Sequence, residues 1–139
     1  MAKHCETYDH PSDLGLTARG DSLAEVFEAL AEGLANEICP REQVHPRHTR
    51  QICARANQVE YLAVEFLSEL MSLFDLERFL PAEVHVIDIN ENAVRADVLG
   101  ETYNSRRHEL GPEIKAVTYH ELEVRQDDAG WVARVLCDL

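Results

Sequence analysis

The stretch EVHVIDINENAVRADVLGE, residues 83–101, decides the class of fold. Apolar and polar residues alternate through EVHVIDIN and again through AVRADVLGE, and the sequence NEN between the two runs supplies turn residues. This is the pattern of two antiparallel strands joined as a hairpin. AVTYHELEV (116–124) and WVARVLCDL (131–139) repeat the scheme around a turn at 127–130. We therefore expect antiparallel sheet in the second half of the chain.

Two segments of the first half show helical spacing instead. Apolar residues recur on one stripe at 22–39 and again at 58–77, and a strand is expected between them at 49–54. Each helix has a candidate cap at its start, Ser22 for the first and Asn57 for the second. Both are followed three residues later by a glutamate, which is the spacing of an N-terminal capping pair.

The order of these elements indicates an α+β fold. We expect a largely antiparallel β-sheet with two amphipathic helices packed on it, in a single compact domain spanning residues 1–139. No apolar run approaches the roughly 18 residues that a membrane span needs. The opening MAKHCETYDH also lacks the apolar segment of a secretory signal. We expect a cytoplasmic protein without a membrane segment.

The net charge of −13 restricts the partners that the protein can bind. A surface this negative repels phosphate backbones, so we expect no strong direct nucleic-acid binding. A divalent cation or a basic protein surface suits the charge better. The four cysteines stand far apart and include no Cys-x-x-Cys pair, which argues against a zinc ribbon and against a dithiol redox site.

The tetrad HPSD, residues 10–13, is the first candidate for chemistry. Pro11 cannot donate to a strand ladder and suits a tight turn. Such a turn can fold the chain back and bring the imidazole of His10 and the carboxylate of Asp13 together. In the structural alternative, Asp13 caps the turn through backbone amides and His10 is simply exposed.

The C-terminal strand is the second candidate. Both of its faces are largely apolar, which is typical of an interior strand, and an ionised Asp138 at its end needs a cation or hydrogen-bond donors. Leu139 follows and adds a terminal carboxylate. If the first and last strands are neighbours, Asp13 joins these two acids in an oxygen-rich site suited to Ca²⁺, Mg²⁺ or Mn²⁺. The alternative is a terminus that frays into solvent.

Lys115 is the third candidate. It is one of only two lysines in a chain with eleven arginines, and it lies between apolar residues in EIKAV. It could act as a compact ammonium near the acids or be an ordinary solvated cation. His108 and His120 flank the region and are expected to be structural, because no Ser-His-Asp or Cys-His arrangement can be assembled from the spacing.

Several motifs together resemble the archease family. They are DHPSDLGLTARGDSLAEVFEALAEGL, YLAVEFLSELMSLFD, GE, RHE, EIKAVTYHELEV and WVARVLCDL, and in this order they run along nearly the whole chain. Two positions depart from the family pattern. HPSD stands where the family often has HTAD, and Phe66 stands where it often has a tryptophan. Neither departure removes a proposed ligand.

The resemblance implies an accessory protein rather than an enzyme. Archeases assist the RNA ligase of tRNA splicing and RNA repair, which joins 3′-phosphate or cyclic-phosphate ends to 5′-hydroxyl ends. They promote guanylylation of the ligase's active-site histidine and its repeated turnover. The implied ligands of a divalent cation are Asp13, Asp138 and Leu139, with Ca²⁺ expected first and Mg²⁺ or Mn²⁺ as alternatives. We assign ligase activation to His10, Asp13, Lys115 and Asp138.

Two other functions fit the same residues. The first is a stand-alone metal-dependent phosphoester hydrolase with His10 as general base beside ion-bound water. The second is an acidic interaction module whose carboxylates bind a basic partner without a cation. Turnover without ligase that is lost in Asp13→Ala would favour the hydrolase. Equal activation of a ligase by metal-free protein would favour the module.

Overall fold

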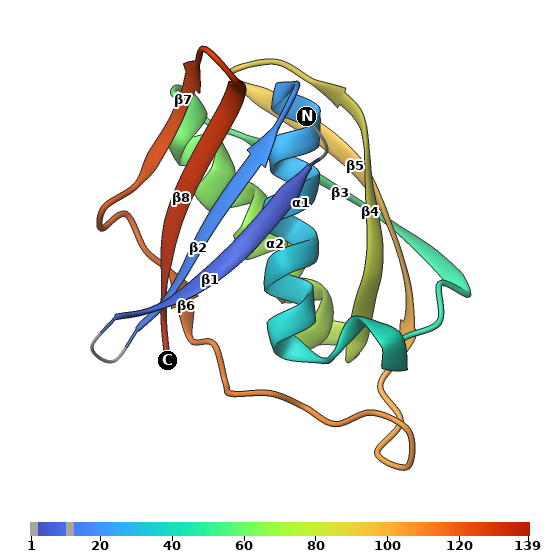
Figure 1. Cartoon of the computed structure of the whole chain (residues 1–139). Helices are drawn as coiled ribbons and strands as arrows, with labels where there is room; N and C mark the ends of the chain where they lie inside the picture. Colours follow the sequence, from blue (N-terminus) through green and yellow to red (C-terminus); the bar gives the residue numbers. More distant parts are fainter. Residues whose placement is uncertain (1–2, 11–12) are drawn as a thin grey trace.

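The computed structural model describes residues 3–10 and 13–139 (Figure 1). Its elements, in chain order, are β1 (His4–His10), β2 (Asp13–Gly20), α1 (Leu23–Ile38), the 3₁₀ turn η1 (Arg41–Gln43), β3 (His48–Arg55), α2 (Val59–Glu77), β4 (Phe79–Ile89), β5 (Ala93–Thr102), β6 (Ala116–Val117), β7 (Glu123–Asp127) and β8 (Gly130–Asp138). All of the described strand pairs are antiparallel, so the predicted α+β class is confirmed. Within the described residues, neither helix is long and apolar enough to cross a membrane.

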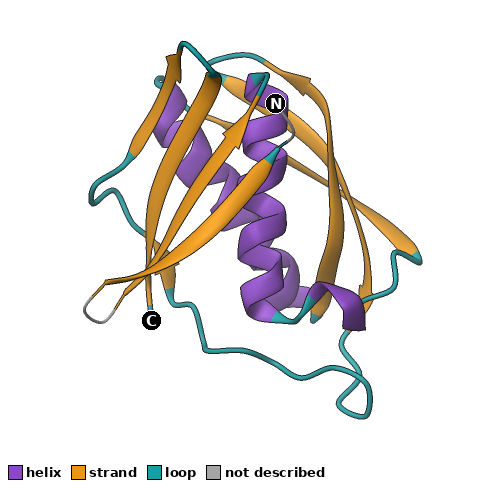
Figure 2. Cartoon of the chain, in the orientation of Figure 1, coloured by secondary structure: helices purple, strands orange, loops and turns teal. Residues whose placement is uncertain are grey.

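The strands form two sheets, and the helices lie between them (Figures 1 and 2). The larger sheet has five strands, with β1, β2, β8 and β6 in that order and β7 also paired to β8. The smaller sheet has the order β3, β5, β4. Both helices contact strands of both sheets. Because α1 is covered on two sides, small residues are needed where the strands approach it closely. Ala29, Ala31 and Ala35 are buried on this helix together with its large apolar residues.

Two glutamates of α1 bond to the backbone of the smaller sheet. The amides of Val84 and Val86 on the edge strand β4 donate to Glu32 (3.0 Å) and Glu28 (2.8 Å). The ammonium of Lys3 lies 3.4 Å from Glu28 and 3.1 Å from Glu32. These part-buried carboxylates therefore have both backbone donors and a counter-charge.

The first helix begins as predicted, and the second does not. Ser22 accepts a hydrogen bond from the amide of Glu25 at 3.1 Å, which confirms it as the N-cap. The prediction of an Asn57–Glu60 capping pair is wrong, because Gln58 is the N-cap of α2 and makes no side-chain cap bond in the described structure. Packing holds α2 in place instead. Its largest fully buried side chains are Leu62, Phe66, Leu67 and Leu70.

The predicted strand 116–124 is interrupted. The chain leaves the sheet after β6 and rejoins it as β7, and Glu121 between them has a positive φ of 53°. The amide and the hydroxyl of Thr118 both donate to the carbonyl of Leu136, at 2.9 and 3.1 Å. The same hydroxyl accepts from the amide of His120 at 3.2 Å. Threonine hydroxyls that bond to nearby backbone compete with a strand ladder, which accounts for the break.

Candidate acidic site at the end of the larger sheet

One row of residues crosses four strands at the end of the larger sheet. His10 on β1 is the register partner of Asp13 on β2. Asp138 on β8 is in turn the partner of Asp13 on one side and of Ala116 on β6 on the other. The strands that carry the two predicted acids are therefore neighbours, as expected from the sequence. The predicted turn between His10 and Asp13, and the side chain of His10, lie outside the described residues.

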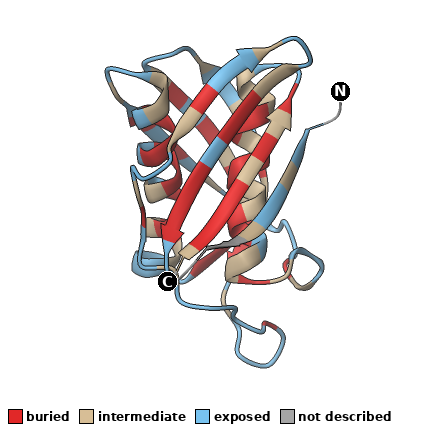
Figure 3. Ribbon diagram, turned by 60° about the vertical axis from the view of Figure 1, so that its left-hand side comes forward, coloured by how far each residue is buried: buried red, intermediate tan, exposed pale blue. Residues whose placement is uncertain are grey.

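Asp13 and Asp138 point away from the core. Side chains alternate along a strand, and the adjacent residues Leu14 and Cys137 belong to the main hydrophobic core. Direct partners of an antiparallel pair share a face, with Cβ atoms about 5 Å apart. Figure 3 shows that β8 is buried along most of its length and becomes exposed at its C-terminal end. The two carboxylates therefore lie side by side where the sheet meets solvent.

The thiol of Cys137 lies beneath the two acids, on the core side of β8. Its pKa is raised to about 12, first by burial, then by Asp138, with further contributions from Cys5 and Asp13. The site concentrates negative charge, and Cys137 stays a neutral thiol beneath it.

Lys115 is joined to the end of β8 through its backbone. Its amide donates to the carbonyl of Asp138 at 2.8 Å, and the residue is exposed. The structure therefore brings the backbones of His10, Asp13, Lys115 and Asp138 to one end of the sheet. Leu139 follows Asp138 directly and is 40% exposed.

The chemistry of these residues fits an oxygen-preferring divalent cation. Like charges directly opposite each other on neighbouring strands are unfavourable unless something compensates them. Carboxylate oxygens are also the ligands that Ca²⁺ and Mg²⁺ prefer. No group of three or more His, Cys, Asp or Glu side chains is arranged to hold a metal ion in the part of the chain that the structure describes. Leu139 follows Asp138 directly and lies at the same strand end as the two carboxylates.

An aromatic–glycine pair covers the strand next to the acids. Tyr8 and Gly15 are partners on β1 and β2, and the ring of Tyr8 occupies the space that a Cβ of Gly15 would need. The guanidinium of Arg134 on β8 lies 5.7 Å from the centre of that ring, within cation–π range. Sequence analysis missed this pair. A glycine inside a strand is the signal that could have found it, because it often marks such a close approach.

A buried ion cluster anchors the segment 103–115, which leads to the acidic site. Glu101, at the end of β5, is only 4% exposed. Its carboxylate accepts three hydrogen bonds, from Arg107 (2.7 Å), the amide of His45 (2.8 Å) and Nε2 of His108 (3.0 Å). Burial disfavours the ionised form, but these donors outweigh burial and lower the pKa of Glu101 to about 2.

The other nitrogen of His108 completes the anchor. The amide of Asn104 donates to Nδ1 of His108 at 2.8 Å, so Nε2 carries the proton that is donated to Glu101. Further along the segment, the amide of Gly111 donates to the carbonyl of Ile38 at 2.8 Å. His108 is thus structural, as predicted, and the segment is fastened at both places before it reaches Lys115.

The fold and the site define a small α+β protein with an acidic strand-end site. Residues 5–139 match the Archease protein family (MTH1598/TM1083). Protein archease of Thermococcus kodakarensis is 35% identical over 138 residues, which cover 96% of this chain and 97% of that protein. Protein archease of Methanosarcina acetivorans is 34% identical over 143 residues, covering 100% and 98%. The solution structure of Methanobacterium thermoautotrophicum protein 1598 matches with a TM-score of 0.81 at 27% identity, covering 99% of each chain. This chain belongs to the archease family.

Proposed function

We propose that this protein activates an RNA ligase of tRNA splicing and RNA repair. It promotes guanylylation of the ligase's active-site histidine and so supports multiple turnover. The function is the one that the family resemblance implies. The observation that carries it is the row in which Asp13 and Asp138 face each other, with the backbone amide of Lys115 bonded to the carbonyl of Asp138. In this proposal the protein is an accessory factor, not an enzyme, and acts in the cytoplasm with its ligase.

The shape of the site suits action at another protein's nucleotide-binding site. Phosphoryl transfer depends mainly on positioning and on neutralisation of charge, so an activator needs no nucleophile of its own. The pairing of β2 with β8 fixes the positions of Asp13 and Asp138. The backbone of Lys115 is held at the same strand end, and its exposed ammonium can bond to phosphate oxygens as a compact charge.

Asp13, Asp138 and the terminal carboxylate of Leu139 would hold the divalent cation, with Ca²⁺ expected first. When bound, the cation supplies positive charge that offsets the charge of phosphate groups. The net charge of −13 keeps the rest of the surface from attracting RNA. The protein would therefore approach the basic surface of the ligase rather than its RNA substrate.

A multiple-turnover ligation assay tests the proposal. RNA with 3′-phosphate and 5′-hydroxyl ends is supplied in excess over the cognate ligase, and guanylylated ligase is measured in parallel. Wild type is expected to accelerate both the ligation of RNA and the guanylylation of the ligase. Three variants should remain folded but lose most of this acceleration: Asp138→Ala, Lys115→Ala and a deletion of Leu139. Asp128→Ala is the matched control, because Asp128 is exposed in the turn at the opposite end of β8.

Three results would contradict parts of the proposal. Unchanged acceleration by Asp138→Ala would remove the acidic site from the mechanism. Phosphoester hydrolysis by the isolated protein, lost in Asp13→Ala, would establish the hydrolase instead. Equal activation by protein stripped of divalent cations would leave an acidic interaction module that needs no ion.

A further inference from the structure

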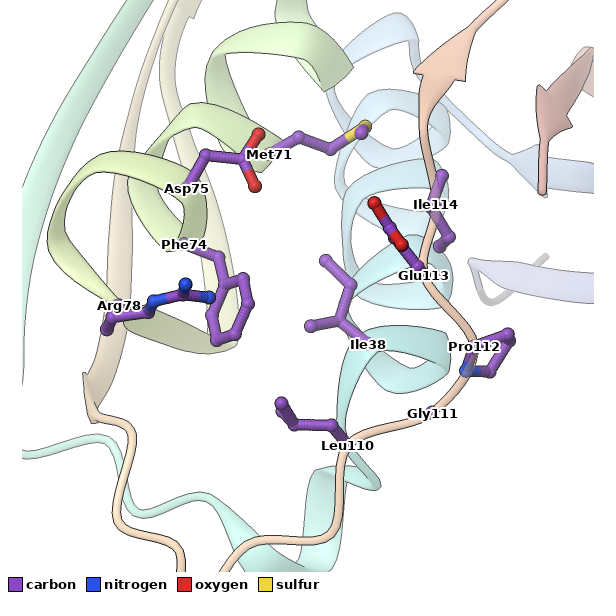
Figure 4. A pocket seen from close by; sticks show the side chains of 10 residues that line it. All are labelled: Ile38, Met71, Phe74, Asp75, Arg78, Leu110, Gly111, Pro112, Glu113 and Ile114. Atoms are coloured by element: carbon purple, nitrogen blue, oxygen red, sulfur yellow. The ribbon is translucent and has the colours of Figure 1, made fainter.

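A pocket of about 360 Å³ lies where both helices end and the segment 103–115 passes across them (Figure 4). Ile38 ends α1, and Phe74 lies in the last turn of α2. The segment supplies the opposite wall. The described residues that line the pocket are Ile38, Met71, Phe74, Asp75, Arg78, Leu110, Gly111, Pro112, Glu113 and Ile114.

The pocket has an apolar interior that the fold leaves open. Leu110 is 44% exposed, although it is a large apolar side chain. Figure 4 shows the side chains of Ile38, Phe74 and Leu110 around the same space. The amide of Gly111 holds the segment there by donating to the carbonyl of Ile38. The backbones approach so closely that a Cβ on Gly111 would collide with the carbonyl of Glu37. The space between helices and segment is therefore part of the fold.

The rim of the pocket is acidic. Asp75 on α2 and Glu113 on the segment are exposed and lie on opposite sides of the opening (Figure 4). The carbonyl ends of α1 and α2 add partial negative charge, and neither helix has a basic residue in its last turn. Arg78 is the one basic residue among the described lining residues, and its guanidinium lies 4.9 Å from the centre of the Phe74 ring.

We infer that this pocket is a second docking point for the RNA ligase, and that it takes an apolar side chain flanked by lysine or arginine. The inference rests on the proposed function. An apolar interior with an acidic rim disfavours RNA, nucleotides and other anions. It suits an amphipathic basic segment, whose apolar anchor is buried while its charges meet Asp75 and Glu113.

The pocket is well placed for joint action with the acidic site. Glu113 lines the pocket, and Lys115, two residues later, is bonded to Asp138. One ligase surface can therefore cover both. In this arrangement the pocket supplies affinity and orientation, whereas the acidic site supplies activation. Changes in the pocket should weaken binding of the ligase without lowering the activation that is reached at saturation.

The charge of the rim is tested with the double variant Asp75→Lys/Glu113→Lys. Ligation by the cognate ligase is titrated with each variant, and the ligase Kd is measured separately by calorimetry. We expect the double variant to raise the Kd by roughly tenfold, which is typical for loss of one interface anchor, with the same maximal acceleration. Glu91→Lys/Asp128→Lys makes the same change in net charge at exposed turn residues outside the pocket and should leave the Kd nearly unchanged.

The apolar interior is tested with Leu110→Ser, which should also raise the Kd. Ile87→Ser is the control, because Ile87 is 51% exposed on β4 and lies outside the pocket. Equal Kd values for the rim variant and its charge control would overturn the inference. Self-association that Leu110→Ser abolishes would assign the pocket to a second copy instead. If wild type neither binds nor accelerates the ligase, the proposed function itself has failed. The titration of wild type alone shows this, before any variant is compared.

Discussion

Asp13 and Asp138 face each other across the β2–β8 pair, although they lie near opposite ends of the sequence. Like charges placed directly opposite each other on neighbouring strands repel. A bound divalent cation would reduce the repulsion between these two carboxylates. The arrangement also gives a measurement of cation binding that does not depend on a ligase.

The first prediction concerns Asp138→Asn in the presence of EDTA. Removal of one of the paired charges is expected to raise the free energy of unfolding by roughly 0.2–1 kcal/mol, as measured by urea denaturation. Ca²⁺ at about a hundredfold excess over its Kd should stabilise wild type by about 2.7 kcal/mol and Asp138→Asn much less. Glu91→Gln, in the β4–β5 turn, should behave as wild type. Equal stability of wild type with Ca²⁺ and with EDTA would contradict cation binding.

The second prediction concerns Glu101→Gln and pH. The folded-state pKa of Glu101 is about 2, below its ordinary value of 4.5, so its ionised form stabilises the fold above pH 4.5, and this stabilisation is lost as the pH falls toward 2. At pH 7 the variant should lose about 2–3 kcal/mol relative to wild type, and the difference should shrink at pH 3. Urea denaturation at both pH values measures it. Glu109→Gln, at an exposed neighbour, is the control and should lose much less stability at pH 7 than Glu101→Gln.

The third prediction concerns the Tyr8–Gly15 pair. Gly15→Ala places a methyl group where the ring of Tyr8 lies, so we expect a loss of about 1–3 kcal/mol in the free energy of unfolding. In the double variant Tyr8→Ala/Gly15→Ala the clash is absent, and the two effects should not add. A double-mutant cycle by thermal denaturation gives the coupling. Strict additivity would show that the ring does not restrict position 15.

The fourth prediction compares the starts of the two helices. Ser22→Ala removes a cap bond to Glu25 and should lower the free energy of unfolding by about 1 kcal/mol. Asn57→Ala removes no cap, because Gln58 holds that position without a side-chain bond in the described structure, and should change stability by less than about 0.5 kcal/mol. Chemical denaturation of both variants provides the comparison. A larger loss for Asn57→Ala would restore the capping pair that the sequence suggested.

Periodicity and local turn residues were sufficient to predict both helices and the β4–β5 hairpin. The proximity of Asp13 to Asp138 was expected only on the condition that the first and last strands are neighbours, and the pairing of β2 with β8 meets that condition. The interruption after Val117 could not be predicted, because it depends on the Thr118 hydroxyl reaching the carbonyl of Leu136 on another strand. Local spacing contains no information about such a partner.

The same limit applies to the surroundings of the site. Glu101 is held by donors at positions 45, 107 and 108, and only the folded chain brings position 45 to the others. The pocket likewise requires both helices to end at one side of the molecule. The sequence offered Asp13, Lys115 and Asp138 as separate candidates, and their meeting depended on which strands are neighbours. The elements that position them could not be predicted, because they depend on tertiary packing.

The bonds from β4 to Glu28 and Glu32 have a consequence for behaviour at high concentration. An edge strand normally offers free amides that can recruit a strand from another molecule and start aggregation. Here a helix of the same chain occupies the amides of Val84 and Val86 with carboxylates. Pro81 offers no amide hydrogen, and the register shifts near it and after Val86 bend the strand further. This border of the smaller sheet therefore offers few free amides along 81–86 to a strand of another molecule, which disfavours polymerisation through β4.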